Sequence, residues 1–237
     1  MLRQGEHAMQ GCIFDLDGTL LDTLADIAGA CNAILAAHGQ PVHTMAAYRQ
    51  MVGSGFPVLI RRAWPPEVLA RLSPAEQEGV LAETRAWYAA HLHDHTRPYP
   101  NMVQTLHRLA ACGVRLAVLS NKPEELTRPL VEYFFPDIPF VAVHGGCAAR
   151  PLKPDPAAAA GVLAALGLSA ENCYYVGDSD VDMYTAHNCG MNAVGAAWGF
   201  RGPEELCAAK AHHIVNCPED LLALPYTVGS QGYETRM

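Results

Sequence analysis

The sequence predicts an α/β fold: a doubly wound parallel sheet with an α-helical domain inserted after its first strand. Strand-like and helix-like segments alternate from residue 103 onward, a pattern typical of a parallel sheet covered by helices on both faces. One more strand-like segment, Cys12–Phe14, precedes this run. Between them, residues 22–98 are rich in alanine, leucine and arginine, and their apolar side chains recur every three or four residues without a strand signal.

The composition of the 237-residue chain excludes several classes of protein. Half of the residues are hydrophobic and 17% are charged, so the chain can bury a sizeable core. Lys and Arg number 16 against 24 Asp and Glu, and the net charge of −8 makes nucleic acid and anionic membranes poor partners. No apolar run approaches the ~18 residues of a membrane helix. A bound anion therefore needs local positive charge, and the chain has only three lysines, at positions 122, 153 and 210.

The eight cysteines indicate a reducing environment. They are scattered singly and form no Cys-x-x-Cys pair, as is typical of reduced thiols in a cytoplasmic protein. Residues 1–10 contain no apolar segment that resembles a secretory signal. We therefore expect a cytoplasmic protein.

The first strand and the helical insert follow from local signals. Cys12–Phe14 is short and apolar and is followed by Asp-Leu-Asp-Gly, which predicts a buried strand ending in a tight turn. Asp26–His38 predicts a helix that Gly39 ends. Ser73 predicts a helix start, because a serine cap is followed three residues later by Glu76.

After a linker at residues 97–100, strands and helices alternate. The predicted strands are Val114–Leu119, Phe140–Val143, Tyr174–Val176, Ala193–Ala197 and Ile214–Val215. The predicted helices are Val103–Cys112, Glu124–Phe135, Ala157–Leu166 and Val181–Cys189. We assign residues 10–21 and 99–225 to an α/β core, 22–98 to a helical domain, and 1–9 and 226–237 to tails, with 229–237 frayed.

Polar residues follow three of the predicted strands. Asp15 and Asp17 follow the first, residues 120–122 (Ser-Asn-Lys) the second, and residues 177–182 (Gly-Asp-Ser-Asp-Val-Asp) the third. Ligands of open parallel sheets bind beyond the carboxyl ends of the strands, so we expect these groups to converge. Lys153, in a loop before a helix, can reach the same edge.

This set of residue types fits phosphoryl transfer. Asp15, Asp17 and Asp178 offer hard oxygen ligands, which suit Mg²⁺ better than zinc. Lys153 supplies a further positive charge, and Ser120 with the following amide can hold an anionic oxygen. One carboxylate can then attack phosphorus while another carries the proton.

The motifs resemble those of the haloacid dehalogenase superfamily, in the same order. They are Asp15-Leu-Asp-Gly-Thr-Leu-Leu-Asp-Thr, Ser120-Asn-Lys, Lys153-Pro and Gly177-Asp-Ser-Asp-Val-Asp, and the helical insert lies where that family places its small cap. The resemblance extends from Gly11 to Leu224 and is greatest for phosphoglycolate phosphatase-like members. It implies a Rossmann-like core whose cap closes over the substrate. It also implies Mg²⁺-dependent hydrolysis of a small phosphorylated metabolite, a phosphoglycolate-like monoester, through an aspartyl-phosphate. We expect a monomer or a homodimer.

The resemblance also implies roles for individual residues. Asp15 is the nucleophile, and Asp17 is the general acid and then the general base. The Asp15 carboxylate, the Asp17 carbonyl and Asp178 hold Mg²⁺. Thr19 and Asp182 support the metal ligands, and Asp182 can pair with Lys153.

Further residues are assigned to substrate binding by the same resemblance. Ser120 and the Asn121 amide bind the phosphoryl group, and Lys153 bridges it to Asp15. The loop around Gly53 resembles a glycine-bearing cap loop that closes on the active site, although a plain interhelical turn is an equal alternative.

Several alternatives remain open. Asp17 argues against a dehalogenase, which needs no proton for its leaving group, and the lack of lysine between residues 21 and 121 argues against Schiff-base chemistry in the cap. A sugar or nucleotide phosphatase, a pyrophosphatase, a hexose-phosphate mutase and a catalytically silent binding or regulatory relative stay as alternatives, although Asp15, Asp17, Lys153 and Asp178 are all present.

Three patterns have a second interpretation. A calcium loop at Asp178 would need glycine and glutamate where Met183 and Cys189 stand. Cap arginines could meet a substrate carboxylate, but a solvated helix face is the favoured interpretation of Arg49, Arg61 and Arg62. Zinc binding is less favoured than a polar helix end for His91, His93 and His95.

Overall fold

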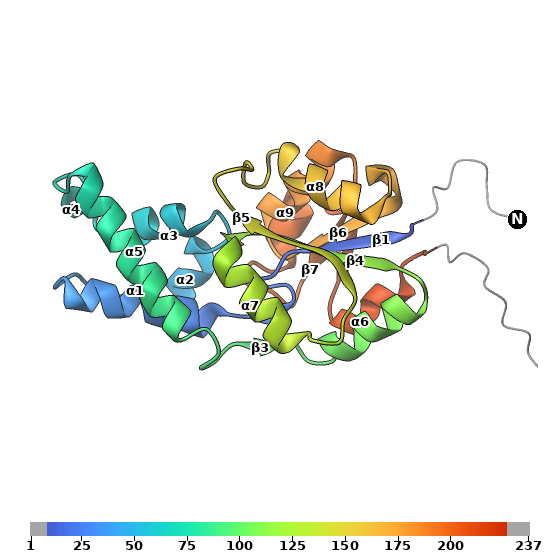
Figure 1. Ribbon diagram of the computed structural model, residues 1–237, viewed down its shortest axis with the longest axis horizontal. Coiled ribbons are helices and arrows are strands. Elements are labelled where there is room, and N and C mark those ends of the chain that lie inside the picture. Colours follow the sequence, from blue (N-terminus) through green and yellow to red (C-terminus); the bar gives the residue numbers. More distant parts are fainter. Residues whose placement is uncertain (1–8, 227–237) are drawn as a thin grey trace, which may run out of the picture.

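A six-stranded parallel sheet forms the centre of the computed structural model, which describes residues 9–226 (Figure 1). The strand order is β5-β4-β1-β6-β7-β8. The strands are β1 (Gly11–Phe14), β4 (Arg115–Pro123), β5 (Phe140–Gly146), β6 (Cys173–Gly177), β7 (Asn192–Ala196) and β8 (His213–Val215). After β1 the chain adds strands first on one side and then on the other, so the order reverses between β1 and β6. The predicted doubly wound sheet is confirmed, and its switch point lies beside β1.

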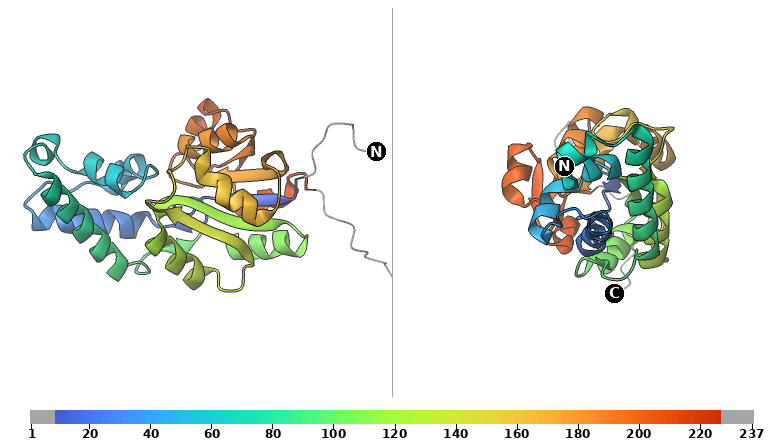
Figure 2. Two further views of the ribbon diagram at one scale, coloured as in Figure 1. Left: turned by 45° about the horizontal axis from the view of Figure 1, so that its top comes forward. Right: turned by 90° about the vertical axis from the view of Figure 1, so that its left-hand side faces the viewer.

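Helices cover both faces of this sheet (Figure 2). One face carries α8 (Ala157–Leu166), α9 (Asp180–Cys189) and α10 (Pro203–Ala208), and the other carries α6 (Met102–Ala111), α7 (Glu124–Phe134) and η2 (Pro218–Ala223). Side chains of β1 alternate between the two layers: Cys12 and Phe14 join one buried apolar cluster and Ile13 joins the other. Burial on both faces explains why β1 is a continuous apolar run rather than an alternating one.

The strand boundaries correct two predictions. β4 continues through Pro123, so the Ser-Asn-Lys motif forms the end of the strand instead of following it. The strand is longer because it stays buried from Leu116 to Pro123 and pairs across a register shift with Gly146 of β5. The predicted linker at residues 97–100 contains a short strand, β3 (Arg97–Pro98), which pairs antiparallel with β2 (Leu21–Asp22).

Five helices follow β2 and precede β3 in the sequence, and they lie beyond the carboxyl ends of the parallel strands (Figure 1). They are α1 (Leu24–Ala37), α2 (Met45–Met51), α3 (Phe56–Ala63), α4 (Pro66–Leu69) and α5 (Pro74–Ala90), and α1 packs against α5. The predicted capping box is present: the Glu76 amide donates to Ser73 Oγ at 3.3 Å, and the Ser73 amide donates to the Glu76 carboxylate at 2.7 Å. The helical insert is confirmed, and its bounds as a separate domain, 22–98, stay a prediction.

Two expectations concern the chain as a whole. Within residues 9–226, no helix is both long and apolar enough to cross a membrane. All eight cysteines lie in this part of the chain, and each is a free thiol. Apart from Met9 and Tyr226, the predicted tails lie outside the described residues.

Asp26, in the first turn of α1, fixes the point at which the chain returns from the helical insert to the core. Its carboxylate is buried and accepts hydrogen bonds from the amides of His95, at 3.0 Å, and Thr96, at 2.8 Å. It also accepts one from Thr96 Oγ1, at 2.7 Å. One side chain thereby joins the beginning and the end of the insert.

We expect Asp26→Ala to lower the free energy of unfolding by about 3 kcal/mol, because it leaves buried donors without an acceptor. Urea denaturation measures the change. Asp94→Ala is the matched control, since Asp94 is exposed, and should change stability by less than about 0.5 kcal/mol. Equal, small effects of the two variants would contradict the role given to Asp26.

Candidate active site

The ends of β1, β4 and β6 bring the predicted residues together. Asp15 directly follows β1 and Asp178 directly follows β6, while Ser120 and Asn121 lie in the last residues of β4. These strands are neighbours in parallel register, with Phe14 opposite both Val118 and Val176. The groups therefore converge at the switch point of the sheet, where ligands of such folds bind.

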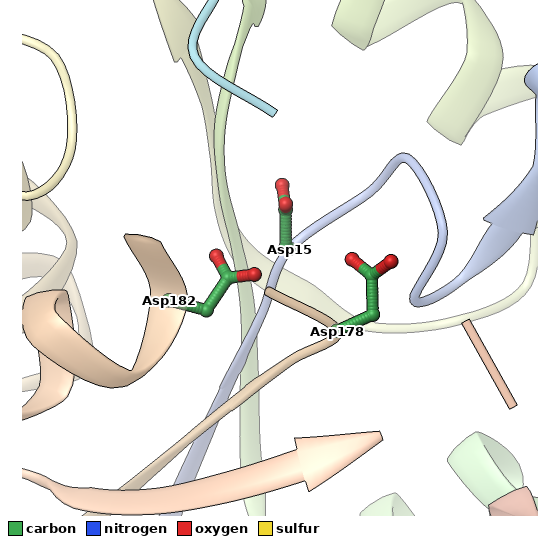
Figure 3. A group of neighbouring side chains, drawn as sticks. All are labelled: Asp15, Asp178 and Asp182. Carbon is green, nitrogen blue, oxygen red and sulfur yellow. The ribbon is translucent and has the colours of Figure 1, made fainter. Parts of the chain in front are cut away.

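Three buried carboxylates form the centre of the site (Figure 3). Each of Asp15, Asp178 and Asp182 offers an oxygen atom, and these atoms lie within 4.8 Å of one another. In residues 9–226 no other group of three or more potential metal-ligating side chains gathers in this way. The Asp17 carboxylate is not a member of the cluster, and the contribution of the Asp17 backbone carbonyl to a metal site, implied by the family resemblance, stays a prediction.

Burial disfavours the charged forms of these carboxylates. The pKa of Asp15 is raised to about 6, because the effect of burial is larger than the opposite effect of the neighbouring Lys153 ammonium. Burial, together with the Asp182 and Asp15 carboxylates, raises the pKa of Asp178 well above its ordinary value. Hard oxygen donors crowded in this way fit a divalent cation such as Mg²⁺, because the ion removes the repulsion between them.

Lys153 compensates part of the negative charge. Its Nζ lies 2.7 Å from Asp182 Oδ1 and 3.0 Å from Asp15 Oδ2, as the predicted pairing requires. Burial opposes the charge of Lys153, but the two carboxylates outweigh it and hold its pKa well above the ordinary value. Asp182 also accepts hydrogen bonds from the amide and hydroxyl of Ser179 at the start of α9, at 3.1 and 2.7 Å. The start of α9 thus holds the Asp182 carboxylate in place, and Asp182 in turn orients Lys153.

Asp17 has a partner that the sequence analysis did not assign. Lys122 Nζ lies 2.9 and 3.2 Å from the two Asp17 carboxylate oxygens and donates to Tyr88 Oη of α5 at 2.7 Å. Thr23 Oγ1 donates to the same Asp17 carboxylate at 2.7 Å. The pKa of Lys122 is lowered, because burial lowers it more than the Asp17 carboxylate raises it. The one sequence signal for this role was that Lys122, one of only three lysines, lies inside a motif.

Asn121 connects three segments through its side chain. Its Oδ1 accepts from the Lys153 amide at 2.7 Å, and its Nδ2 donates to the Lys153 carbonyl at 3.0 Å and to the Gly53 carbonyl at 3.3 Å. The neighbouring Ser120 hydroxyl accepts from the Lys122 amide at 3.3 Å. Asn121 therefore holds the Lys153 loop and the Gly53 loop of the insert against the end of β4.

Close packing fixes the position of Asp178. The Phe200 amide donates to its Oδ2 at 2.7 Å, and Thr19 Oγ1 donates to its Oδ1 at 3.4 Å, which is the support expected of Thr19. Gly18 has a φ of 81° and lies so near that a Cβ there would collide with the Asp178 carboxylate. Glycine is required at this turn for both reasons.

A pocket opens between the strand ends and the helical insert. Its polar side comprises Asp15, Asp17, Ser120, Asn121 and Lys122, and the insert contributes Ile27, Val52, Gly53, Gly55, Phe56 and Leu59. The pocket therefore combines charged and polar groups with apolar walls, as small-molecule sites do. Gly53 is one of these lining residues, and its predicted role in a loop that closes on the site stays a prediction.

The cap arginines and histidines lie elsewhere. Arg49, Arg61 and Arg62 are exposed and do not line this pocket, and Arg62 donates to the Met51 carbonyl at 2.8 Å. His91 stacks on Trp87 with ring centroids 3.8 Å apart, and His93 stacks on Tyr133 at 4.2 Å.

The fold and the site define a class of enzyme. A doubly wound sheet with a helical insert, whose first strand ends in two aspartates beside a buried lysine, is the arrangement of a phosphoryl-transferring hydrolase. Residues 12–196 match the family model described as haloacid dehalogenase-like hydrolase, and the chain belongs to this family. It is a phosphoric monoester hydrolase.

Named relatives support the same assignment. The chain is 33% identical to Phosphoglycolate phosphatase 1 of Pseudomonas aeruginosa, over 89% of this chain and 77% of that protein. It is 37% identical to a phosphoglycolate phosphatase of Rhodospirillum rubrum, over 79% of each chain. A crystal structure from Haemophilus somnus, described as a predicted phosphoglycolate phosphatase, has a TM-score of 0.84 and 30% identity, covering 91% of this chain and 97% of that one.

The charge cluster predicts the pH dependence of stability in metal-free protein. The pKa of Asp15 is raised from 3.8 to about 6, and that of Asp178 is raised well above its ordinary value. Folding therefore favours the protonated forms, and this stabilisation is lost as the pH rises through the folded-state pKa of each group, which for Asp15 is about 6. Asp178→Asn removes one charge and should keep its acceptor for the Phe200 amide. In EDTA we expect the variant to gain stability relative to the wild type by about 2 kcal/mol between pH 5 and pH 8.

Urea unfolding at the two pH values tests this expectation. Added Mg²⁺ should stabilise the wild type at pH 8 and leave Asp178→Asn nearly unchanged. A stability difference that stays constant with pH would show that repulsion within the cluster is not what governs stability.

Proposed function

We propose that this phosphatase hydrolyses a small phosphate monoester with an acidic alcohol, 2-phosphoglycolate or a close analogue, through an aspartyl-phosphate. One observation carries the proposal: Asp15, whose carboxylate forms an ion pair with Lys153, lines the same small pocket as Asp17. The names of the relatives support the substrate class. The apolar walls from the insert support a small substrate enclosed away from bulk water.

Asp15 is the proposed nucleophile. Its Oδ1 accepts a hydrogen bond from the Leu16 amide at 2.7 Å, and its Oδ2 lies 3.0 Å from Lys153 Nζ. Both contacts fix the carboxylate for in-line attack on phosphorus, and the Lys153 charge attracts the phosphoryl oxygens. The Ser120 hydroxyl and the Asn121 amide would bind the remaining oxygens.

Asp17 is the proposed proton carrier. It lines the same pocket, two residues from Asp15, and would donate a proton to the leaving oxygen and later accept one from the attacking water. Thr23 and Lys122 hold its carboxylate in position. A nucleophile and a proton carrier on one turn explain why both steps can use one pocket.

The acidic cluster would hold Mg²⁺. Asp15, Asp178 and the Asp17 carbonyl are the proposed ligands, and Asp182 keeps Lys153 and the start of α9 in place. When bound, the ion would neutralise the charge that develops on the phosphoryl group. The free cysteines support a cytoplasmic location, and we expect a monomer or a homodimer acting on a small phosphorylated metabolite.

A panel of phosphorylated metabolites, assayed with and without Mg²⁺ and ranked by kcat/KM, tests the proposal. The panel should include 2-phosphoglycolate, sugar phosphates, nucleotides and pyrophosphate. A separate assay should test for hexose phosphate mutase activity. The expected result is Mg²⁺-dependent turnover with short acidic esters first. Preference for a hexose phosphate or a nucleotide would refute the substrate class.

We expect Asp15→Asn to lower kcat at least about 10³-fold, because the amide cannot form the acyl-phosphate. Rapid acid quenching with ³²P-labelled substrate should trap a phosphoprotein in the wild type and none in the variant. Wild-type turnover by Asp15→Asn would rule out the nucleophile.

The Gly53 loop gives a second prediction. Gly53 has a φ of 118°, and a Cβ there would have no neighbour nearer than Ser179 Oγ at 4.0 Å. Gly53→Val should therefore strain the backbone of the loop, displace its contact with Asn121 and lower kcat/KM about tenfold. The matched control is Gly39→Val, which has a φ of 65° and open space at the end of α1. Equal kinetics of the two variants would count against a role of this loop in the site.

A further inference from the structure

Lys122 is the only cationic side chain among the residues that line the pocket. Its side chain is 1% exposed, and its Nζ lies between Asp17 of the core and Tyr88 of α5. The Tyr88 ring also lies beneath the ammonium, 4.3 Å from its centroid. Lys153, the other buried lysine of the site, contacts Asp15 and is the cation proposed to bind the phosphoryl group.

The position of Nζ matches the second charge of the proposed substrate. In 2-phosphoglycolate the carboxylate carbon is two bonds from the ester oxygen that Asp17 would protonate. Lys122 Nζ lies 2.9 Å from that same Asp17 carboxylate, so it is one hydrogen bond from the proton carrier. An ammonium has three N–H donors, and Nζ has three oxygen partners: the two Asp17 carboxylate oxygens, at 2.9 and 3.2 Å, and Tyr88 Oη, at 2.7 Å. A ligand oxygen would replace the longest of these contacts, the one to Asp17 Oδ2.

Other cationic side chains of the described residues do not line this pocket. The cap arginines 49, 61 and 62 are exposed and are not among its lining residues. Lys153 is held by Asp15 and Asp182. Arg201 donates to the carbonyls of Gln50 and Val52, at 3.0 Å each, and does not line the pocket.

We propose that Lys122 binds the carboxylate of the leaving alcohol and selects phosphorylated two-carbon hydroxy acids over neutral esters of the same size. Tyr88 is a positioning residue that holds Nζ toward the pocket. The inference rests on the proposed function and names the side chain that gives it specificity. Because Tyr88 belongs to the helical insert, Lys122 Nζ would contact both the substrate carboxylate and the insert. Binding of the charged substrate would therefore depend on the insert being packed against the core.

The test compares two esters that differ only at the second charge: 2-phosphoglycolate and 2-hydroxyethyl phosphate. The measured quantity is the ratio of their kcat/KM values, for the wild type and for Lys122→Met, in Mg²⁺. We expect the wild type to favour phosphoglycolate and Lys122→Met to reduce the ratio about 30-fold, because only one substrate loses a charged contact. Lys210→Met, at an exposed lysine, is the matched control and should leave the ratio unchanged.

An equal loss on both esters would overturn the inference, because Lys122 would then act through Asp17 alone. A wild-type ratio near one would also overturn it while leaving the phosphatase mechanism intact. Hydrolysis of neither ester would refute the proposed function itself, and the inference with it.

Tyr88→Phe provides a second variant in case Lys122→Met does not fold. It keeps the ring and removes the hydroxyl that holds Nζ, so the KM for phosphoglycolate should rise several-fold with a smaller change for the neutral ester. Tyr48→Phe is its control, because the Tyr48 hydroxyl donates to Asn32 and does not line the pocket. Identical effects of Tyr88→Phe on the two esters would contradict the proposed positioning role.

Discussion

Concentrated negative charge at the ends of β1 and β6 is the constraint on which the rest of the site depends. Asp15, Asp178 and Asp182 are buried within one small volume, and such a group needs either cations beside it or protonation of a carboxyl group. Lys153 supplies one cation inside the protein. The remaining repulsion favours a divalent ion, so the proposed binding of Mg²⁺ would follow from the same burial that raises the pKa values of Asp15 and Asp178.

Compensation of this charge also joins the segments of the protein. Lys153 binds the first strand end to the start of α9 through Asp15 and Asp182. Lys122 joins Asp17 to Tyr88 of the insert, and Asn121 reaches the Gly53 carbonyl. Polar contacts made by Lys122 and Asn121, which line the pocket, therefore connect the insert to the core. A substrate that changes these contacts would also change how the insert sits on the core.

The arrangement separates two tasks. In the proposed mechanism, groups at the strand ends hold the phosphoryl group and carry out the chemistry. The insert contributes the apolar walls of the pocket, opposite the polar groups of the core, and also Tyr88, which accepts a hydrogen bond from Lys122. Selectivity is thus expected to depend on a few side chains, while the fold itself is compatible with many substrates.

The sequence by itself determined the alternating strands and helices, the Ser73–Glu76 helix start and the convergence of the motifs, because these depend on short-range periodicity, capping and the geometry of parallel sheets. Only the tertiary structure decided the pairing of Lys122 with Asp17, 105 residues apart, and the turn of the Asn121 side chain toward Gly53. Contacts between distant residues depend on how the insert packs on the core. One sequence shows which side chains are available, but packing selects their partners, and burial sets the strength of their charges.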